Sequence, residues 1–129
     1  MYSVALDGTD DSLKTGVSTD FRVANDANWT IEGWFFFTTN PTTTQTHIFN
    51  YTDDSGFNWS AIEYMMYITT GGILTMEWAG GSGLIQHDIG NGTDFPLNQW
   101  HHIAVTCDST NVHMFWNGTH CGSDNNAFT

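Results

Sequence analysis

Short β-forming runs, separated by turn residues about every 8–12 positions, most strongly constrain how this chain can fold. The runs are rich in Thr, Ile, Val, Trp, Phe and Tyr, and Gly, Asn, Asp and Ser separate them. No segment shows a helical period, so the pattern is typical of an all-β domain. The expected strands are Tyr2–Leu6, Trp29–Thr38, His47–Tyr51, Ala61–Thr69, Ile73–Trp78, Leu84–Ile89, Trp100–Cys107, Val112–Trp116 and Thr119–Cys121.

Alternation within the runs assigns side chains to the two faces of each strand. In two neighbouring strands near the C-terminus, apolar residues recur at every second position, which predicts that they are buried together between two sheets. These residues are Ile103, Val105, Val112, Met114 and Trp116.

Other runs are assigned in the same way. Thr75 and Glu77 lie on the face of Ile73–Trp78 opposite its apolar residues Leu74, Met76 and Trp78. The runs Trp29–Thr38 and Ala61–Thr69 are apolar on both faces, which predicts central strands that are covered on both sides. The tryptophans assigned to the core are Trp34, Trp78, Trp100 and Trp116.

Charge excludes two classes of partner. The 129 residues include 14 acidic side chains but only Lys14 and Arg22 as cations, which gives a formal net charge of −12. Nucleic acids and anionic membrane surfaces require clustered basic side chains, and no apolar run approaches the roughly 20 residues of a membrane helix. We therefore expect no nucleic-acid binding and no membrane insertion, whereas divalent cations are attracted to such a chain.

Four patches of sequence resemble one known family and follow its order. They are Ala5–Leu13 (ALDGTDDSL), Trp29–Phe35 (WTIEGWF), Trp100–Thr106 (WHHIAVT) and Val112–Gly118 (VHMFWNG). Together they are similar to the laminin G-like, pentraxin-like branch of the concanavalin A-like lectin/glucanase superfamily. The resemblance implies a jelly-roll sandwich of two antiparallel sheets.

The chain departs from the family's pattern at its C-terminus. Family members continue after the Asn-Gly hairpin through a glycine-bearing strand and a last strand that closes the sheet beside the first, whereas this sequence stops at Thr129. Either the sequence is a fragment, or a neighbouring segment supplies the missing strands. We expect a single domain over residues 1–129 that belongs to a longer polypeptide or assembly, with an exposed strand edge that another chain covers.

The glutamates argue against catalysis. Glucanases of this superfamily use a Glu-x-Asp-x-Glu arrangement on a single strand, which places the acid and the nucleophile on one face. Glu32, Glu63 and Glu77 each stand alone on their strand, with no other carboxylate two residues away. We therefore expect that the chain is not an enzyme.

The loop after His47–Tyr51 is the candidate site. Residues 53–58 (DDSGFN) concentrate oxygen ligands of the kind that calcium prefers. Their position resembles the loop that supplies the first calcium ligands in pentraxins, which implies Asp53, Asp54 and Asn58 as metal ligands. The second group of pentraxin ligands would lie beyond the last residue, and the alternative is an ordinary solvated turn.

Aromatic residues beside this loop suit a sugar ring, because flat apolar rings next to hydrogen-bonding groups are typical of sugar sites. Tyr64 and Tyr67 are further candidates for such a platform. The predicted ligand-binding residues are Tyr51, Asp53, Asp54, Asn58 and Trp59.

Histidines and cysteines are given structural roles. His101 and His102 are adjacent and point to opposite faces, so their side chains cannot share a zinc ion. A two-residue turn at Asn117-Gly118, with Asn117 at positive φ, places Cys121 opposite Met114. Cys107, opposite Val112, is then about 9–10 Å from Cys121, beyond disulfide reach, so we expect free buried thiols. Five sequons, expected to be unglycosylated, begin at Asn28, Asn50, Asn58, Asn91 and Asn117.

Two functions of different classes fit these features. The resemblance implies a non-catalytic carbohydrate-binding or adhesion module on a virion or extracellular surface, with calcium as cofactor and glycans as partners. The alternative is a structural packing module of a virion fibre, capsid decoration or extracellular filament, with copies of itself or other structural chains as partners. The Asn- and Gly-rich segment 117–126 resembles marine phage fibre and decoration proteins, and fold alone does not decide function.

Overall fold

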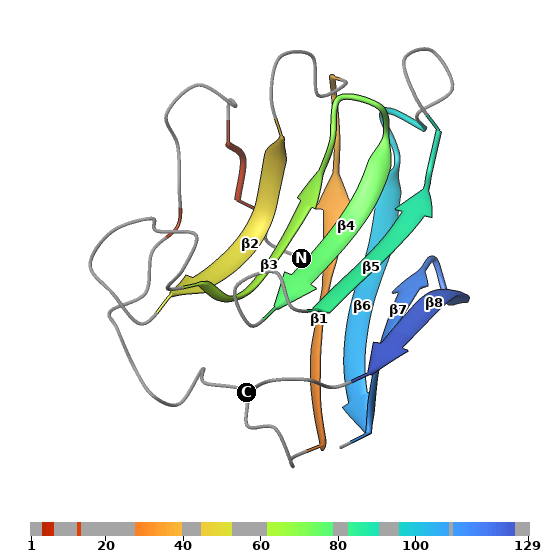
Figure 1. Ribbon diagram of the computed structural model, residues 1–129. Coiled ribbons are helices and arrows are strands. Elements are labelled where there is room, and N and C mark those ends of the chain that lie inside the picture. The colour runs from red at the N-terminus through yellow and green to blue at the C-terminus, as the bar shows by residue number, and fades with distance from the viewer. Residues whose placement is uncertain are drawn as a thin grey trace.

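Two antiparallel sheets pack face to face as the layers of a sandwich (Figure 1). The computed structural model describes residues 4–6, 13, 28–39, 45–52, 62–78, 83–90, 96–108 and 110–125. These residues contain no helix, and they form eight strands. The strands are β1 (Asn28–Phe36), β2 (Thr46–Thr52), β3 (Ile62–Ile68), β4 (Ile73–Trp78), β5 (Gly83–Asp88), β6 (Trp100–Asp108), β7 (Asn111–Trp116) and β8 (Thr119–Asn125).

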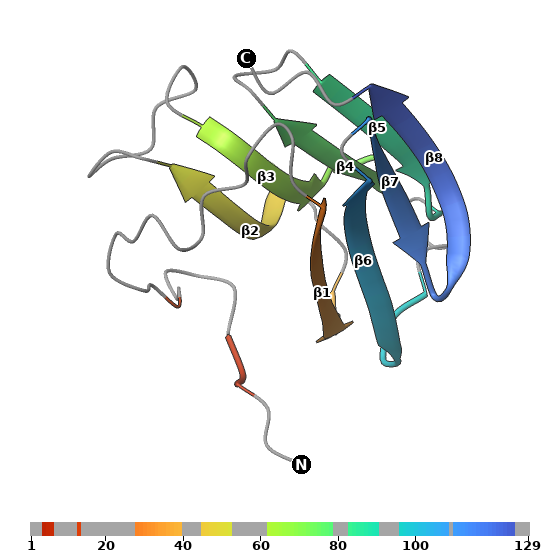
Figure 2. The same cartoon turned by 90° about the horizontal axis from the view of Figure 1, so that it is seen from below.

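The strand order explains how the layers meet. Sheet A has the order β1-β6-β7-β8, and sheet B has the order β2-β3-β4-β5. The backbone N–H of Leu84 on β5 donates to Asp124 Oδ2 on β8 at 3.1 Å, so the two sheets are joined along this side, as Figure 2 shows. The predicted all-β sandwich of two antiparallel sheets is confirmed.

Most of the expected strands are present, and Ile73–Trp78 has the expected bounds. The first expected strand is wrong in its described part, because residues 4–6 lie outside any strand and Val4 and Leu6 are exposed. Tyr2 and Ser3 lie outside the described residues. An alternating sequence becomes a strand only where a neighbouring backbone completes its hydrogen bonds, and alternation alone does not supply that neighbour.

The two runs that were apolar on both faces have different positions. β3 is central in sheet B, with Tyr64 and Met66 in the inter-sheet core and Met65 and Tyr67 buried on the other face, as predicted. β1, in contrast, is the last strand of sheet A among the described strands, and its residues alternate between half-buried and exposed. Its assignment as a doubly covered strand was therefore wrong.

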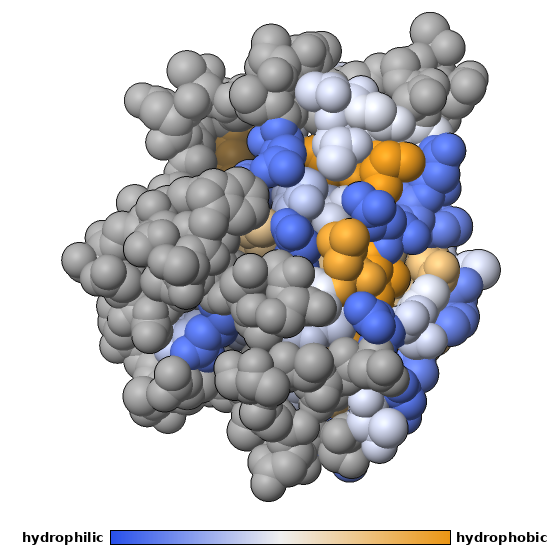
Figure 3. All heavy atoms as spheres, viewed as in Figure 1, coloured by the Kyte–Doolittle hydropathy of each residue, from blue (hydrophilic) through white to orange (hydrophobic). Residues whose placement is uncertain are grey.

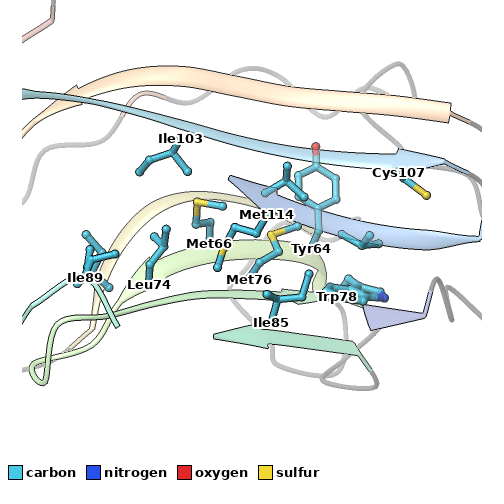
Figure 4. Packing of buried hydrophobic residues seen from close by; sticks show 13 residues of the cluster. Tyr64, Met66, Leu74, Met76, Trp78, Ile85, Ile89, Ile103, Cys107 and Met114 are labelled. Carbon is cyan, nitrogen blue, oxygen red and sulfur yellow. The ribbon is translucent and has the colours of Figure 1, made fainter. Parts of the chain in front are cut away.

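The apolar layer between the sheets forms the main core (Figure 4). Ile103, Val105, Val112 and Met114 of sheet A are at most 1% exposed, as predicted. They face residues of sheet B, among which Met66, Leu74, Met76 and Trp78 are completely buried. Trp116, which was expected to be buried with these residues, is only half-buried. It packs partly against this layer and stacks on His101, with ring centroids 4.4 Å apart.

Two tryptophans assigned to the core are on the surface instead. Trp34 is 65% exposed and Trp100 is 48% exposed, because both side chains point to the outer face of sheet A. Trp78, in contrast, is completely buried, as expected. Alternation does not say which face of β1 meets the other sheet, because both of its faces are aromatic. Trp100, in contrast, is three positions from Ile103, so alternation itself places it on the face opposite the core.

The β7–β8 hairpin has the predicted turn. Asn117 and Gly118 have φ angles of 50° and 79°, and Trp116 pairs with Thr119. A register shift follows, so that Met114 pairs with Gly122 instead of the expected Cys121, which is the extra residue of a β-bulge. Neither Cys107 nor Cys121 forms a disulfide, as predicted, although Cys121 is only half-buried.

Gly83 provides a test of the core packing. It pairs with Trp78 across β4 and β5, and a Cβ atom at this position would overlap the indole ring. We expect Gly83→Ala to lower the free energy of unfolding by about 1–3 kcal/mol, because Trp78 has no free space into which to move. Urea unfolding measures this change.

Gly71→Ala is the matched control. A Cβ atom there would meet only Thr69 Oγ1 at 3.7 Å, which is an ordinary contact. We expect this substitution to change the unfolding free energy by less than about 0.5 kcal/mol. Equal effects of the two substitutions would contradict the packing of Trp78 against β5.

Candidate functional site

The predicted loop site is represented in the described residues by Tyr51 alone. Asp53, Asp54, Asn58 and Trp59 lie outside them. Tyr51 is a half-buried residue near the end of β2, and its ring stacks on Tyr64 with centroids 5.4 Å apart and an interplanar angle of 16°. Its role in ligand binding stays a prediction.

The other two tyrosines proposed for an exposed platform are buried. Tyr64 is 7% exposed and faces the inter-sheet core, while Tyr67 is 6% exposed on the opposite face of β3. Burial, followed by the neighbouring Tyr51 and Glu63, raises the pKa of Tyr64 to about 12. Tyr64 is thus a neutral core residue at physiological pH.

The outer face of sheet B brings polar side chains from four strands together, and we call it the polar face. Residues directly opposite each other in neighbouring antiparallel strands project to the same side of the sheet. The register therefore forms two rows across the sheet, which are His47–Tyr67–Thr75–Gln86 and Asn50–Met65–Glu77–Leu84. Figure 3 looks onto this side, where hydrophilic and hydrophobic residues are interspersed over the described part.

Burial on the polar face is greatest over its central strands. Thr75 on β4 is completely buried, and Met65 on β3 is 1% exposed. Toward the flanks, His47 and Asn50 on β2 and Gln86 on β5 are exposed. The face thus combines an enclosed centre with hydrogen-bonding groups around it.

Glu77 is the charged group at this centre. Burial, and next the hydrogen bond to Glu77, raise the pKa of Tyr67 to about 12, while the nearby Thr75 hydroxyl opposes the shift. Tyr67 therefore keeps its proton and donates it toward the carboxylate. Glu77 Oε2 and Thr75 Oγ1 are both buried, and neither has a hydrogen-bond partner of good geometry in the described part of the chain.

His47 completes the group. Its ring stacks on Tyr67, with centroids 5.8 Å apart and an interplanar angle of 26°. Partial loss of water lowers the pKa of His47, although the charge of Glu77 acts in the opposite direction. A neutral imidazole offers one donor and one acceptor, which suits an uncharged polar ligand.

The sequence analysis did not identify this face as a site. The signal available was that Thr75 and Glu77 lie opposite the apolar face of their strand, as the structure confirms. Glu63 lies on the same face as Glu77, on the neighbouring strand and diagonal to it, whereas Glu32 is in sheet A. Only the pairing of β3 with β4 shows that two glutamates share a face.

The fold and its sequence match a known family. A laminin G-like family model, described as the concanavalin A-like lectin/glucanases superfamily, matches residues 7–129. The chain belongs to this superfamily. Domains of this superfamily's laminin G-like type are often adhesion or carbohydrate-binding modules, often bind calcium, are generally non-catalytic and are usually extracellular.

One solved structure supports the fold of this superfamily member. The chain is similar to a heptameric SAP-like pentraxin from Limulus polyphemus, with a TM-score of 0.51 and 19% sequence identity over 78% of this chain. The match covers 44% of the pentraxin, so this chain spans less than half of its length. The likeness confirms the jelly-roll type of sandwich. No curated protein matches the chain closely enough to be called a relative.

Two further properties concern the described residues only. None of their segments is a helix with the length and apolar character needed to cross a membrane. No three of their His, Cys, Asp or Glu side chains come together in a way that would hold a metal ion. The proposed calcium ligands Asp53, Asp54 and Asn58 lie outside this part of the chain.

The lowered pKa of His47 predicts how stability depends on pH. As the pH falls below the ordinary value of 6.5, the unfolded chain takes up a proton at His47 while the folded protein resists it. Stability is therefore highest above 6.5 and decreases until the pH has passed the lowered pKa. Urea unfolding at a series of pH values should give a shallower decrease for His47→Gln than for the wild type.

Asp108 also affects how stability depends on pH, but in a lower pH range than His47. The backbone N–H groups of Asn111 and Thr110, and next His113, lower the pKa of Asp108 from 3.8. The stability due to Asp108 is therefore present above 3.8 and is lost only at lower pH. Identical curves for wild type and His47→Gln above this range would contradict the assignment to His47.

Proposed function

We propose that the chain is a non-catalytic carbohydrate-binding or adhesion module and that the polar face of sheet B contacts the glycan. The observation that carries this proposal is the pair of buried atoms Glu77 Oε2 and Thr75 Oγ1, neither of which has a hydrogen bond of good geometry in the described part, although the Tyr67 hydroxyl lies near both residues. A buried acceptor without a donor costs about 1–3 kcal/mol, and more when it is charged. A sugar hydroxyl that donates to Glu77 removes this cost.

The surrounding groups fit the same ligand. Sugars combine apolar ring faces with hydroxyls that both donate and accept, and their sites combine aromatic side chains with a few polar groups. On this face the exposed His47 ring stacks on the buried Tyr67, and the exposed Asn50 and Gln86 offer amide donors and acceptors. Recognition therefore uses hydrogen bonds to an uncharged ligand, which the net charge of −12 does not repel.

Calcium extends this proposal to the segment that joins β2 to β3. We assign Asp53, Asp54 and Asn58 as its ligands, with Tyr51 and Trp59 as flanking aromatic contacts. Bound calcium relieves the repulsion between the adjacent carboxylates and offers open coordination positions to vicinal sugar hydroxyls. Contacts of this kind are weak individually and become effective when many copies bind together.

The expected setting is a virion or extracellular surface. A second function remains as the alternative, namely a purely structural packing module of a virion fibre, capsid decoration or extracellular filament. The exposed Trp34, Phe36 and Trp100 favour this alternative, because clustered exposed aromatic residues are typical of protein interfaces. In that case the partners are copies of the chain or other structural chains.

Glycan binding is tested with an oligosaccharide array, followed by calorimetry with the glycan that binds best. We expect Glu77→Gln to weaken binding about tenfold, or about 1.4 kcal/mol, because an amide is a weaker acceptor than a carboxylate. Glu32→Gln is the matched control on the other sheet and should bind as the wild type does. The glycan should be recovered intact, because we propose that the protein binds it without cleaving it.

Two results would count against this assignment. Equal losses in Glu77→Gln and Glu32→Gln would show that the polar face is not the contact surface. Cleavage of the bound glycan that disappears in Glu77→Gln would show that Glu63 and Glu77 work as a catalytic pair of carboxylates, as in glycoside hydrolysis.

Calorimetric titration with calcium tests the loop separately. We expect heat of binding for the wild type, and its loss in the double variant Asp53→Ala/Asp54→Ala, because two of the three proposed side-chain ligands are removed. The variant Asp7→Ala/Asp10→Ala, in the acidic stretch of sequence near the N-terminus, is the control. No heat at about millimolar calcium, the affinity of extracellular modules, would mean that residues 53–58 are a solvated turn.

A further inference from the structure

The outer face of sheet A carries a cluster of exposed aromatic rings, which we call the aromatic face. Trp34, Phe36 and Trp100 are 65%, 44% and 48% exposed, and they come from the neighbouring strands β1 and β6. Phe36 pairs directly with Trp100, and Trp34 pairs with His102. All of these positions belong to one side of the sheet, opposite the inter-sheet core.

The arrangement of the rings favours a protein partner over a sugar. Phe36 meets Trp100 edge to face, with an interplanar angle of 64°, and Trp34 is tilted by 47° against His102. The rings therefore form an uneven apolar surface, whereas stacking on a sugar ring requires a flat one. Tryptophan is enriched among the residues that contribute most of the binding free energy in protein interfaces.

Histidines lie beside the acidic side chains that the structure describes on this face. Glu32 Oε2 lies 3.3 Å from His102 Nε2, and Asp108 Oδ2 lies 3.3 Å from His113 Nε2. His120 on β8 lies beside His113, with ring centroids 5.6 Å apart. Glu32 and Asp108, the carboxylates described on this face, thus each have an imidazole next to them.

We propose that the aromatic face binds the same face of a second copy of this chain around a two-fold axis. In such an isologous contact each surface must be complementary to itself. The apolar rings of one copy then cover those of the other. This inference is independent of the glycan proposal, since it concerns the opposite sheet and a different partner.

The size of the face predicts a weak dimer. Four strands about 4.8 Å apart, with about eight residues of 3.3 Å each, cover roughly 500 Å². Two such faces bury on the order of 1,000 Å², the lower limit for a specific interface. Each copy also carries a net charge of −12, so the copies repel each other at low ionic strength and added salt should strengthen association.

Sedimentation equilibrium of the intact chain tests the proposal. We expect a reversible monomer–dimer equilibrium that shifts toward the dimer when NaCl is raised from about 0.01 M to about 0.1 M, which shortens the Debye length from about 30 Å to about 10 Å. Trp34→Thr should raise the dissociation constant at least about tenfold. Leu84→Thr removes a side chain that is 44% exposed on sheet B and should leave the dimer unchanged.

Several outcomes would overturn the proposal. These are a monomer at every salt and protein concentration, equal weakening by Trp34→Thr and Leu84→Thr, and association that weakens with added salt. Loss of glycan binding in a fully monomeric Trp34→Thr variant would instead assign the aromatic face to sugar. Thermal unfolding of both variants at the wild-type temperature shows that the fold is intact, and Glu77→Gln tests the glycan proposal without altering this face.

Discussion

Burial of the apolar layer between the two sheets is the constraint on which the rest of the structure depends. Trp78, Met76 and Leu74 from β4 meet Met114 and Val105 from sheet A, and all five are completely buried. A protein interior is packed as densely as an organic crystal, so these side chains determine the distance and the angle between the sheets. Every other residue of the same strands is consequently directed outward, where it is available for other roles.

The outward-facing residues of the two sheets differ in character. On sheet B the centre is polar and enclosed, with Thr75 and the Oε2 atom of Glu77 buried beside Tyr67. On sheet A the rings of Trp34 and Trp100 are exposed to solvent. Groups of both kinds carry a free-energy cost in the isolated chain, because the buried polar atoms lack hydrogen bonds of good geometry and the exposed aromatic rings are hydrated. We propose a glycan as the ligand of the face on sheet B and a second copy of the chain as the partner of the face on sheet A.

Membership of the concanavalin A-like superfamily accounts for the sandwich and not for these two faces. The similarity to the Limulus polyphemus pentraxin, at 19% identity, concerns the fold. The outer faces depend on individual residues such as Glu77 and Trp34, and a sandwich of the same topology accepts many other residues there. Function in this chain therefore has to be tested at these positions and at the Asp53–Asn58 loop.

The sequence by itself determined the all-β class, most of the strands, the Asn117-Gly118 turn and the burial of Ile103 and Met114. These features follow from local geometry, because side chains alternate along a strand and a primed turn requires positive φ. Trp34 was misassigned because β1 is aromatic on both faces, whereas the core assignment of Trp100 disregarded its position three residues from the core residue Ile103. The bulge at Cys121 moved the register by one residue. The polar face joins residues 47–86 through strand pairing. Only the tertiary structure decided that Glu77, Tyr67 and His47 meet, because which strands become neighbours depends on how the whole core packs.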